Sequence, residues 1–339
     1  MPLPTPAPRA EGETRATTRP LHWAAWGPEG GPRLLVLHGG PGADHRYLLP
    51  QMLRLADAGY DYVTYDQRGG GRSKAAADDV GPVTWRTHVD DLARLADELV
   101  PGDAPLHLVG YSWGGLLALL YTLDAAGVAL PALGEAVGGR AAHGGPAHAR
   151  RAPASLTLVD PAPITRPLRD RFEAAFAERA RGDAIAAMRA ELAAGGLRER
   201  DPDAHRQRSF ELSVAGYFAD PARARDLTPF RVTARVQQSV WESLGDFDLA
   251  PHLGRVACPT LVVHGRQDPI PLASSEALAA GVPGAELAVL EDCGHVPYVE
   301  QPDALWAAVL PFLERVTAPV TAPVTAPVTA PVTGPAAGR

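Results

Sequence analysis

The sequence predicts an α/β fold, a mainly parallel, doubly wound sheet with a helical cap inserted between two of its strands. Short apolar runs alternate with segments of helical periodicity over most of the chain. A Gly-x-Ser-x-Gly turn at residues 110–114 joins one apolar run to an apolar helical segment. The alternation stops between residues 161 and 245, where amphipathic helical segments take over, and this segment is the expected cap.

The expected strands are mostly continuous apolar runs, which is typical of strands covered on both faces. They span residues 21–26, 32–38, 60–66, 106–110, 155–160, 259–265 and 285–290. Helical segments are expected between and after them, at residues 47–58, 84–99, 116–123, 272–280 and 302–315. The core therefore comprises residues 21–160 and 246–315, and the cap comprises residues 161–245.

Three further segments are expected to contribute little to the core. Residues 1–20 are rich in Pro, Thr and charge, which predicts a disordered tail. Residues 125–153 are dominated by Ala, Gly, Pro and Arg and are expected to form a surface insertion. Residues 316–333 repeat Val-Thr-Ala-Pro, and proline at every fourth position is incompatible with a helix or a sheet interior. A second disordered tail is therefore expected over residues 316–339.

Composition argues against several classes of function. The net charge is −7 with acidic and basic residues interspersed, so neither nucleic acid nor a membrane is an expected partner. No apolar run is long enough to suggest a signal peptide or a membrane span. The two cysteines, Cys258 and Cys293, lack the spacing of a metal site, which favours a reducing, cytoplasmic location without disulfides and without a bound metal.

Ser112, at the centre of the Gly-x-Ser-x-Gly turn, is the candidate nucleophile. A serine hydroxyl is a weak nucleophile, so it must be held at the end of a strand where a base can reach it. Gly110 and Gly114 leave room where the strand and the following helix cross closely. The alternative is a structural serine in a glycine-rich turn, and the flanking strand and helix argue against it.

Candidates for a base and an acid follow in chain order. Asp268 comes just after the strand at 259–265, and His295 just after the strand at 285–290. Both are therefore expected at the carboxyl edge of the sheet with Ser112, where open α/β sheets build their sites. His295 is the one of eleven histidines in the right place and order to act as the base. Asp292 is an alternative acid, but it is too near His295 in sequence to orient its ring.

Two backbone N–H groups are expected to stabilise an oxyanion. One belongs to Trp113, the residue after the candidate nucleophile, and the other to the loop at residues 38–42. Gly40 is the preferred donor in this loop, and Gly39 is the alternative and a candidate substrate contact. Glycines here allow the loop to approach a substrate closely.

Three motifs, in this order and spacing, resemble the proline iminopeptidase (prolyl aminopeptidase) family of α/β-hydrolases. They are His-Gly-Gly-Pro-Gly at 38–42, Asp-Gln-Arg-Gly-x-Gly-Arg-Ser at 66–73 and Gly-x-Ser-Trp-Gly at 110–114. The resemblance covers residues 30–124 and 255–313. It implies an α/β-hydrolase fold with the cap after the sixth core strand. It also implies that Ser112, Asp268 and His295 form a catalytic triad. Gly40 and Trp113 would then form the oxyanion hole.

The resemblance further implies removal of an N-terminal proline from peptides, with acidic residues of the cap binding the free amine. Glu211 and Glu242 are the candidates for this contact. The cap departs from the family directly after the strand at 155–160, where Asp160, Pro161 and Ala162 replace the usual arginine-containing segment.

These observations predict a serine hydrolase that acts on a small peptide or small acyl substrate and requires no metal or organic cofactor. The first hypothesis is an iminopeptidase-like aminopeptidase. The alternative is an esterase or lactonase for small hydrophobic acyl substrates, because the same core motifs serve ester, lactone and amide cleavage. A third hypothesis is a non-catalytic ligand receptor with a hydrolase fold, and loss of turnover in Ser112→Ala would argue against it.

Overall fold

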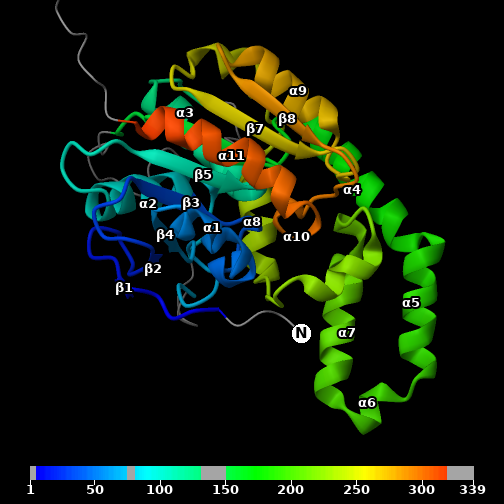
Figure 1. The fold of residues 1–339 in the computed structure, drawn as a ribbon. Helices are drawn as coiled ribbons and strands as arrows, with labels where there is room; N and C mark the ends of the chain where they lie inside the picture. The colour runs from blue at the N-terminus through cyan, green and yellow to red at the C-terminus, as the bar shows by residue number, and fades with distance from the viewer. Residues whose placement is uncertain (1–4, 75–80, 131–149, 319–339) are drawn as a thin grey trace, which may run out of the picture.

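The centre of the molecule is an eight-stranded sheet with the strand order β1-β2-β4-β3-β5-β6-β7-β8 (Figure 1). The computed structural model describes residues 5–74, 81–130 and 150–318. Strands β3 to β8 run parallel to one another. At one edge β2 pairs antiparallel with β4, and β1 pairs antiparallel with β2. The predicted mainly parallel, doubly wound sheet is confirmed. The strands are Ala10–Glu13 (β1), His22–Trp26 (β2), Arg33–Leu37 (β3), Asp61–Tyr65 (β4), His107–Tyr111 (β5), Ser155–Val159 (β6), Thr260–Gly265 (β7) and Glu286–Leu290 (β8).

Helices cover both faces of the sheet, and side chains alternate along each strand between two apolar clusters. In β3, Leu35 and Leu37 pack with α2 (Trp85–Leu99), α3 (Trp113–Ala125) and α9 (Leu272–Gly281). Leu34 and Val36 face the other cluster, which includes α1 (Arg54–Asp57), α10 (Pro297–Glu300) and α11 (Pro302–Thr317). This two-sided burial explains why the central strands read as continuous apolar runs.

The expected disordered tail at residues 1–20 is wrong for residues 10–13, which form β1 and pair with β2. The Arg9 guanidinium reaches Asp61 at 2.7 Å, and the Glu98 carboxylate accepts hydrogen bonds from the amides of Arg15 and Ala16. An edge strand is held largely by backbone hydrogen bonds, so β1 needs little apolar sequence, and the composition of this segment gave no sign of it.

The segment expected to form one helix at residues 47–58 is not a single helix. The segment consists of two short 3₁₀ turns, η1 (His45–Leu48) and η2 (Gln51–Leu53), followed by α1. Leu49 between the turns is extended, with φ −104° and ψ 148°. It precedes Pro50, and a residue before proline is disfavoured in the helical region.

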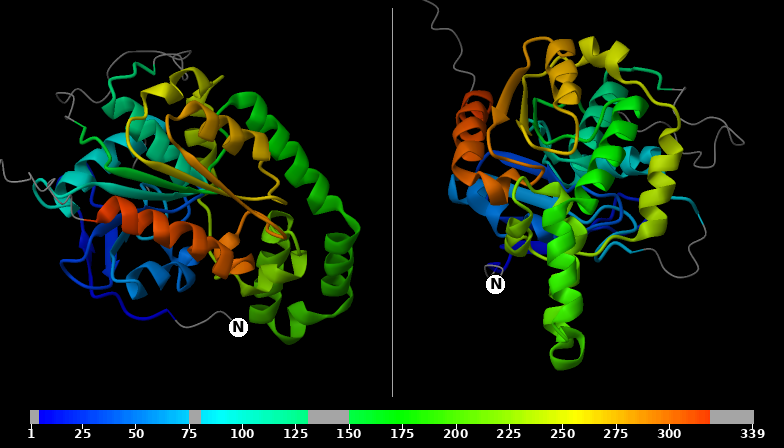
Figure 2. Two further views of the ribbon diagram at one scale, coloured as in Figure 1. Left: turned by 45° about the horizontal axis from the view of Figure 1, so that its top comes forward. Right: turned by 90° about the vertical axis from the view of Figure 1, so that its right-hand side faces the viewer.

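The chain between β6 and β7 is mainly helical and includes the expected cap, residues 161–245. Its middle part, α5 to α7, projects from the body of the molecule as a narrow arm (Figure 2). The elements of this segment are α4 (Arg166–Arg181), α5 (Asp183–Ala194), α6 (Leu197–Arg200), α7 (Pro202–Val214), η3 (Ala215–Tyr217), η4 (Pro221–Asp226), α8 (Ala234–Leu244) and η5 (Ala250–Arg255).

The expected surface insertion and C-terminal tail fall largely outside the described residues, which omit 131–149 and 319–339. Thr317 still belongs to α11, so the expected tail is wrong for its first two residues. Both cysteines are free thiols. Within the described ranges, no helix has the length and apolar character needed to cross a membrane.

Candidate active site

Ser112 occupies a sharp turn between β5 and α3, with φ 52° and ψ −119°. Positive φ is strained for a residue with a side chain, and the tight packing of β5, α3 and β3 maintains it. A Cβ atom on Gly110 would lie 2.4 Å from the Gly114 carbonyl oxygen, and one on Gly114 would lie 2.1 Å from the Leu37 carbonyl oxygen. The two glycines therefore allow the close crossing that presents the Ser112 hydroxyl at the carboxyl edge of the sheet.

Ser112, His295 and Asp268 form a continuous chain of hydrogen bonds. The His295 Nε2 atom lies 2.9 Å from Ser112 Oγ, and its Nδ1 atom lies 2.7 Å from Asp268 Oδ2. The other Asp268 oxygen accepts a hydrogen bond from the Ile270 amide at 2.7 Å. This arrangement can take a proton from the serine hydroxyl and hold the imidazole ring in one orientation. The alternative acid, Asp292, lies exposed on the surface.

The His295 ring lies close to two tyrosine rings. The rings of Tyr111 and Tyr217 each have their centroids 5.2 Å from that of His295. Tyr111 donates its hydroxyl to the His295 carbonyl oxygen at 2.8 Å, and the His295 amide donates to the Tyr217 carbonyl oxygen at 2.7 Å. Burial lowers the pKa of His295 to about 4, so the ring is neutral at pH 7 and able to accept a proton.

The loop expected to supply an oxyanion donor lies against the turn of Ser112. A Cβ atom on Gly39 would lie 2.8 Å from the Ser112 Cβ atom, so the loop approaches the serine as closely as glycine permits. Gly40 has φ +66°, and both glycines line a cavity with Ser112 and Trp113. Trp113 is the first residue of α3, where an N–H has no acceptor within the helix.

Gln67 connects this loop to the serine turn. Its side-chain amide donates to the His38 carbonyl oxygen at 2.7 Å, and its side-chain oxygen accepts from the Trp113 indole N–H at 2.8 Å. The Gln67 backbone N–H donates to His38 Nε2 at 3.1 Å, so the proton of this imidazole belongs on Nδ1, 2.8 Å from the Gly39 carbonyl oxygen. His38 thus orders the glycine loop.

The cavity above Ser112 has a volume of about 410 Å³ and is mainly aromatic and aliphatic. Helices α4, α7 and α8 of the cap form part of its wall. None of the residues described as lining it is an aspartate, a glutamate, a lysine or an arginine. The cap contributes Phe172, Phe176, Phe210, Val214, Tyr217, Phe230 and Trp241, and the core contributes Tyr47, Tyr111, Trp113, Ile270, Val296 and Tyr298, among others.

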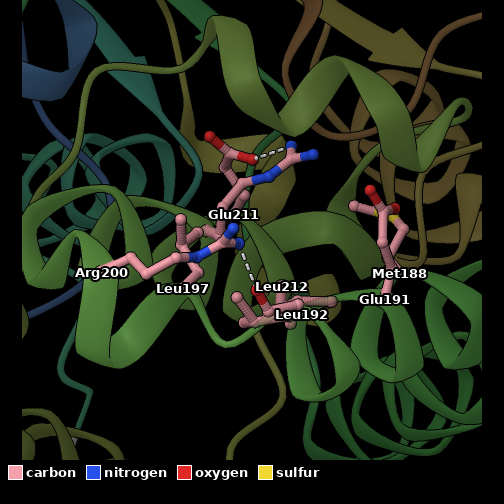
Figure 3. A pocket seen from close by; sticks show the side chains of 9 residues that line it. Met188, Glu191, Leu192, Leu197, Arg200, Glu211 and Leu212 are labelled. Atoms are coloured by element: carbon pink, nitrogen blue, oxygen red, sulfur yellow. Dashed lines mark hydrogen bonds and ion pairs between the residues drawn. The ribbon is translucent and has the colours of Figure 1, made fainter.

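The structure does not bring Glu211 and Glu242 to this cavity. Glu211 lines a separate cavity between α5, α6 and α7 of the arm, where its carboxylate pairs with Arg208 at 2.7 Å (Figure 3). Glu242 is exposed and accepts a hydrogen bond from the side chain of Gln238 at 2.7 Å. Neither residue is among those that line the cavity around Ser112, so the structure does not bring the two expected amine contacts together with the serine.

Sequence reasoning missed one buried acid beside the site, Asp160. Three atoms lie within 4.8 Å of one another: a carboxylate oxygen of Asp160, a carboxylate oxygen of Asp268 and a ring nitrogen of His295. His295 engages Asp268 through one ring nitrogen and Ser112 through the other, so neither nitrogen is available to a metal. A signal was present in the sequence, because Asp160 directly follows a strand, as Ser112 does.

Comparison with known proteins agrees with this architecture. The family model described as "alpha/beta hydrolase fold" matches residues 32–302. A putative carbamate hydrolase RutD from Variovorax paradoxus is 31% identical over 88% of this chain and 98% of that protein. A proline iminopeptidase from Lactobacillus crispatus is 26% identical over 80% of this chain and 86% of that protein.

A solved structure supports the same assignment of the fold. The crystal structure of a proline iminopeptidase from Mycobacterium smegmatis covers 91% of this chain and 98% of its own, with a TM-score of 0.60 and 22% identity. The family model spans β3 to α10, which includes the serine turn after β5 and the helical segment after β6. The chain therefore belongs to the alpha/beta hydrolase fold family.

Proposed function

We propose that the protein is a serine hydrolase in which Ser112, His295 and Asp268 act as a catalytic triad. The hydrogen-bonded chain from Ser112 Oγ through His295 to Asp268, at the floor of a cavity, carries this proposal. Ser112 attacks the substrate carbonyl carbon while His295 takes its proton. Asp268 holds the imidazole tautomer and stabilises the imidazolium that forms.

The backbone N–H groups of Gly40 and Trp113 stabilise the oxyanion of the tetrahedral intermediate. His295 then gives its proton to the leaving group, and the acyl group remains on Ser112. His295 takes a proton from water as the water attacks the acyl carbonyl carbon. The bond between the acyl carbon and Ser112 Oγ then breaks, His295 returns the proton to Oγ, and the acid is released. Every proton transfer uses groups present in this chain.

The cavity favours an uncharged, apolar acyl substrate, and we propose an ester, lactone or carbamate as the substrate class. Aromatic and aliphatic side chains form most of the wall described around Ser112, with no carboxylate among them. Desolvating a substrate ammonium group is costly unless an opposite charge or several acceptors receive it. The wall offers such a group little compensation, whereas it buries an apolar acyl chain favourably.

Release of an N-terminal proline is the second candidate. The motifs at 38–42, 66–73 and 110–114 and the relatives named proline iminopeptidase support it. The proline ring is apolar and compatible with the aromatic wall. This candidate requires the amine to be bound without Glu211 and Glu242.

A paired assay separates the two candidates. Wild type and Ser112→Ala would be compared on p-nitrophenyl esters of increasing acyl length, on proline p-nitroanilide and on its N-acetyl derivative. We expect Ser112-dependent cleavage of the esters, with kcat/KM rising with acyl length until the cavity is filled, and little cleavage of either anilide. The loss in Ser112→Ala should be on the order of 10³-fold or more.

Other outcomes would redirect the assignment. Efficient cleavage of the free proline anilide, lost on N-acetylation, would establish the aminopeptidase instead. Ester cleavage that persists in Ser112→Ala would overturn the proposed nucleophile. Stabilisation of the protein by an ester without any turnover would favour the ligand-receptor hypothesis.

A further inference from the structure

Asp160 stands at the end of β6 in a conformation that aims its side chain into the protein. It has φ 42°, and its side chain is 0% exposed. Its amide donates to the Val263 carbonyl oxygen at 2.8 Å, and its Oδ1 atom accepts from the Gly265 amide at 2.8 Å. A positive φ outside glycine costs free energy, so surrounding contacts must maintain it.

The carboxyl groups of Asp160 and Asp268 lie next to each other in this buried site. A carboxylate oxygen of each lies within 4.8 Å of the other and of a His295 ring nitrogen. Oδ2 of Asp160 is buried, and no donor from another described residue reaches it. Two carboxylates this close cannot both be ionised in a buried site, because each charge opposes the other. The pair therefore holds a proton at neutral pH.

Hydrogen bonding decides which member of the pair holds this proton. Asp268 receives the Ile270 N–H at 2.7 Å and the His295 Nδ1–H at 2.7 Å, which favour its ionised form. Asp160 receives one N–H, from Gly265, on its Oδ1 atom, and its Oδ2 atom receives none from the described residues. Burial raises the pKa of both carboxyl groups, and the hydrogen bonds to Asp268 hold its pKa below that of Asp160.

No positive charge compensates Asp160 from the side of β7. The His264 Nδ1 atom is 3.7 Å from Asp160 Oδ1, but it accepts the Ser275 hydroxyl at 2.9 Å, while Nε2–H donates to the Ile270 carbonyl oxygen. Burial lowers the pKa of His264 to about 4, so this ring is neutral at pH 7. The titratable groups that face Asp160 are Asp268, His295, His264, Cys293, Tyr111 and Tyr298.

We propose that Asp160 is a positioning residue, a neutral carboxylic acid that donates a hydrogen bond to Asp268. The bond fixes the carboxylate of Asp268 toward His295 and keeps a single negative charge beside the imidazole. The kinetic part of this inference rests on the proposed function, whereas the protonation state of Asp160 does not.

Asp160→Asn tests the proposal without removing the hydrogen bond. The asparagine side chain can accept from Gly265 and donate to Asp268, and asparagine tolerates positive φ. We expect kcat to stay within about threefold of wild type, because the donor to the ionised carboxylate is retained. The midpoint of the acidic limb of kcat/KM should not move. If Asp160 were ionised, its replacement would remove a negative charge near His295 and lower this midpoint by about one pH unit or more, which would overturn the proposal.

Asp160→Ala removes the donor. We expect kcat to fall about 10- to 100-fold with little change in KM, the size of effect expected from losing a hydrogen bond to a charged group. Asp292→Ala is the matched control for alanine at positive φ, because exposed Asp292 has φ 50°. Thermal denaturation would check that Asp160→Ala and Asp292→Ala are both folded. Equal kcat in folded Asp160→Ala and in wild type would contradict the proposal.

Infrared difference spectroscopy gives a readout that needs no substrate. The spectrum of wild type minus Asp160→Asn at pH 7 should contain the C=O stretch of a protonated carboxylic acid. A difference that contains carboxylate bands alone would show that Asp160 is ionised and would overturn the proposal. If the band is present but no ester is cleaved, the proposed function fails and the protonated Asp160 stands.

Discussion

At the scale of single residues, the site combines a buried imidazole with a carboxylate and a strained serine. Tyr111 and Tyr217 contact the His295 ring, and the His295 side chain is only 6% exposed. Burial disfavours the imidazolium form and lowers the pKa of His295 to about 4. The proposed base is therefore neutral, and able to accept a proton, at pH values well below the usual histidine range.

This burial predicts the pH dependence of activity. Because His295 must be neutral to accept the Ser112 proton, kcat/KM should be constant from neutral pH down to about pH 5 and fall with a midpoint near its pKa of about 4. Tyr217→Ala should expose the ring to water and move the midpoint upward. Tyr217→Phe keeps the ring and serves as its control. A wild-type midpoint near 6.5 would show that burial does not set this pKa.

At the scale of elements, the cap is connected directly to the loop that carries His295. The Glu300 carboxylate, in α10, accepts the amide of Ala219 at 2.7 Å and that of Gly294 at 2.9 Å. The His295 amide donates to the carbonyl oxygen of Tyr217, at the end of η3. The cap thus forms the cavity wall and also holds the histidine loop in place.

The crossing of β3 and α3 is a second such contact between elements, and it predicts a stability effect. Gly114→Ala would place a Cβ atom 2.1 Å from the Leu37 carbonyl oxygen, so the helix must move away from the strand. We expect the free energy of unfolding to fall by about 1–3 kcal/mol, measured by urea denaturation. Gly254→Ala is the control, because a Cβ atom there meets nothing within 4 Å. Equal stability of Gly114→Ala and wild type would contradict the tight crossing.

At the scale of the whole molecule, buried neutral histidines link stability to pH. His88 is buried behind the serine turn, with its ring centroid 5.9 Å from that of Trp113. Burial lowers its pKa to about 3, far below the 6.5 of an unburied histidine. Between these values the unfolded chain binds a proton at this position and the folded chain does not, so His88 lowers stability progressively as pH falls below 6.5.

Replacing His88 should therefore weaken the pH dependence of unfolding. Between pH 7.5 and pH 5, wild type should lose about 2 kcal/mol more of its free energy of unfolding than His88→Gln does. His88→Leu should show the same smaller loss between pH 7.5 and pH 5. Its free energy of unfolding at pH 7.5 can itself differ from that of wild type, because leucine is apolar. Identical pH profiles for all three proteins, measured by urea denaturation, would mean that burial does not lower the pKa of His88 below that of the unfolded chain.

The sequence by itself was sufficient to predict strands β2 to β8 and the edge of the sheet at which the candidate site lies, but it did not predict β1. Ser112 directly follows β5, and Asp268 and His295 lie in the loops that begin at the ends of β7 and β8. Parallel strands place their carboxyl ends at one edge, so chain order alone indicates that these side chains are neighbours. The glycines of the serine turn could also be identified from the motif, although the carbonyl oxygen that Gly114 must avoid belongs to Leu37 on β3.

Only the tertiary structure decided which residues line the cavity above Ser112 and which acidic side chains lie next to each other. The expected roles of Glu211 and Glu242 depended on the rotation of cap helices, and neither residue is among those that line the cavity around Ser112. The contact between Asp160 and Asp268 joins residues that are far apart in sequence, through the pairing of β6 with β7. Strand ends are set by local pattern, whereas helix orientation and side-chain contacts arise from packing between distant segments, and this packing determines the chemistry of the cavity.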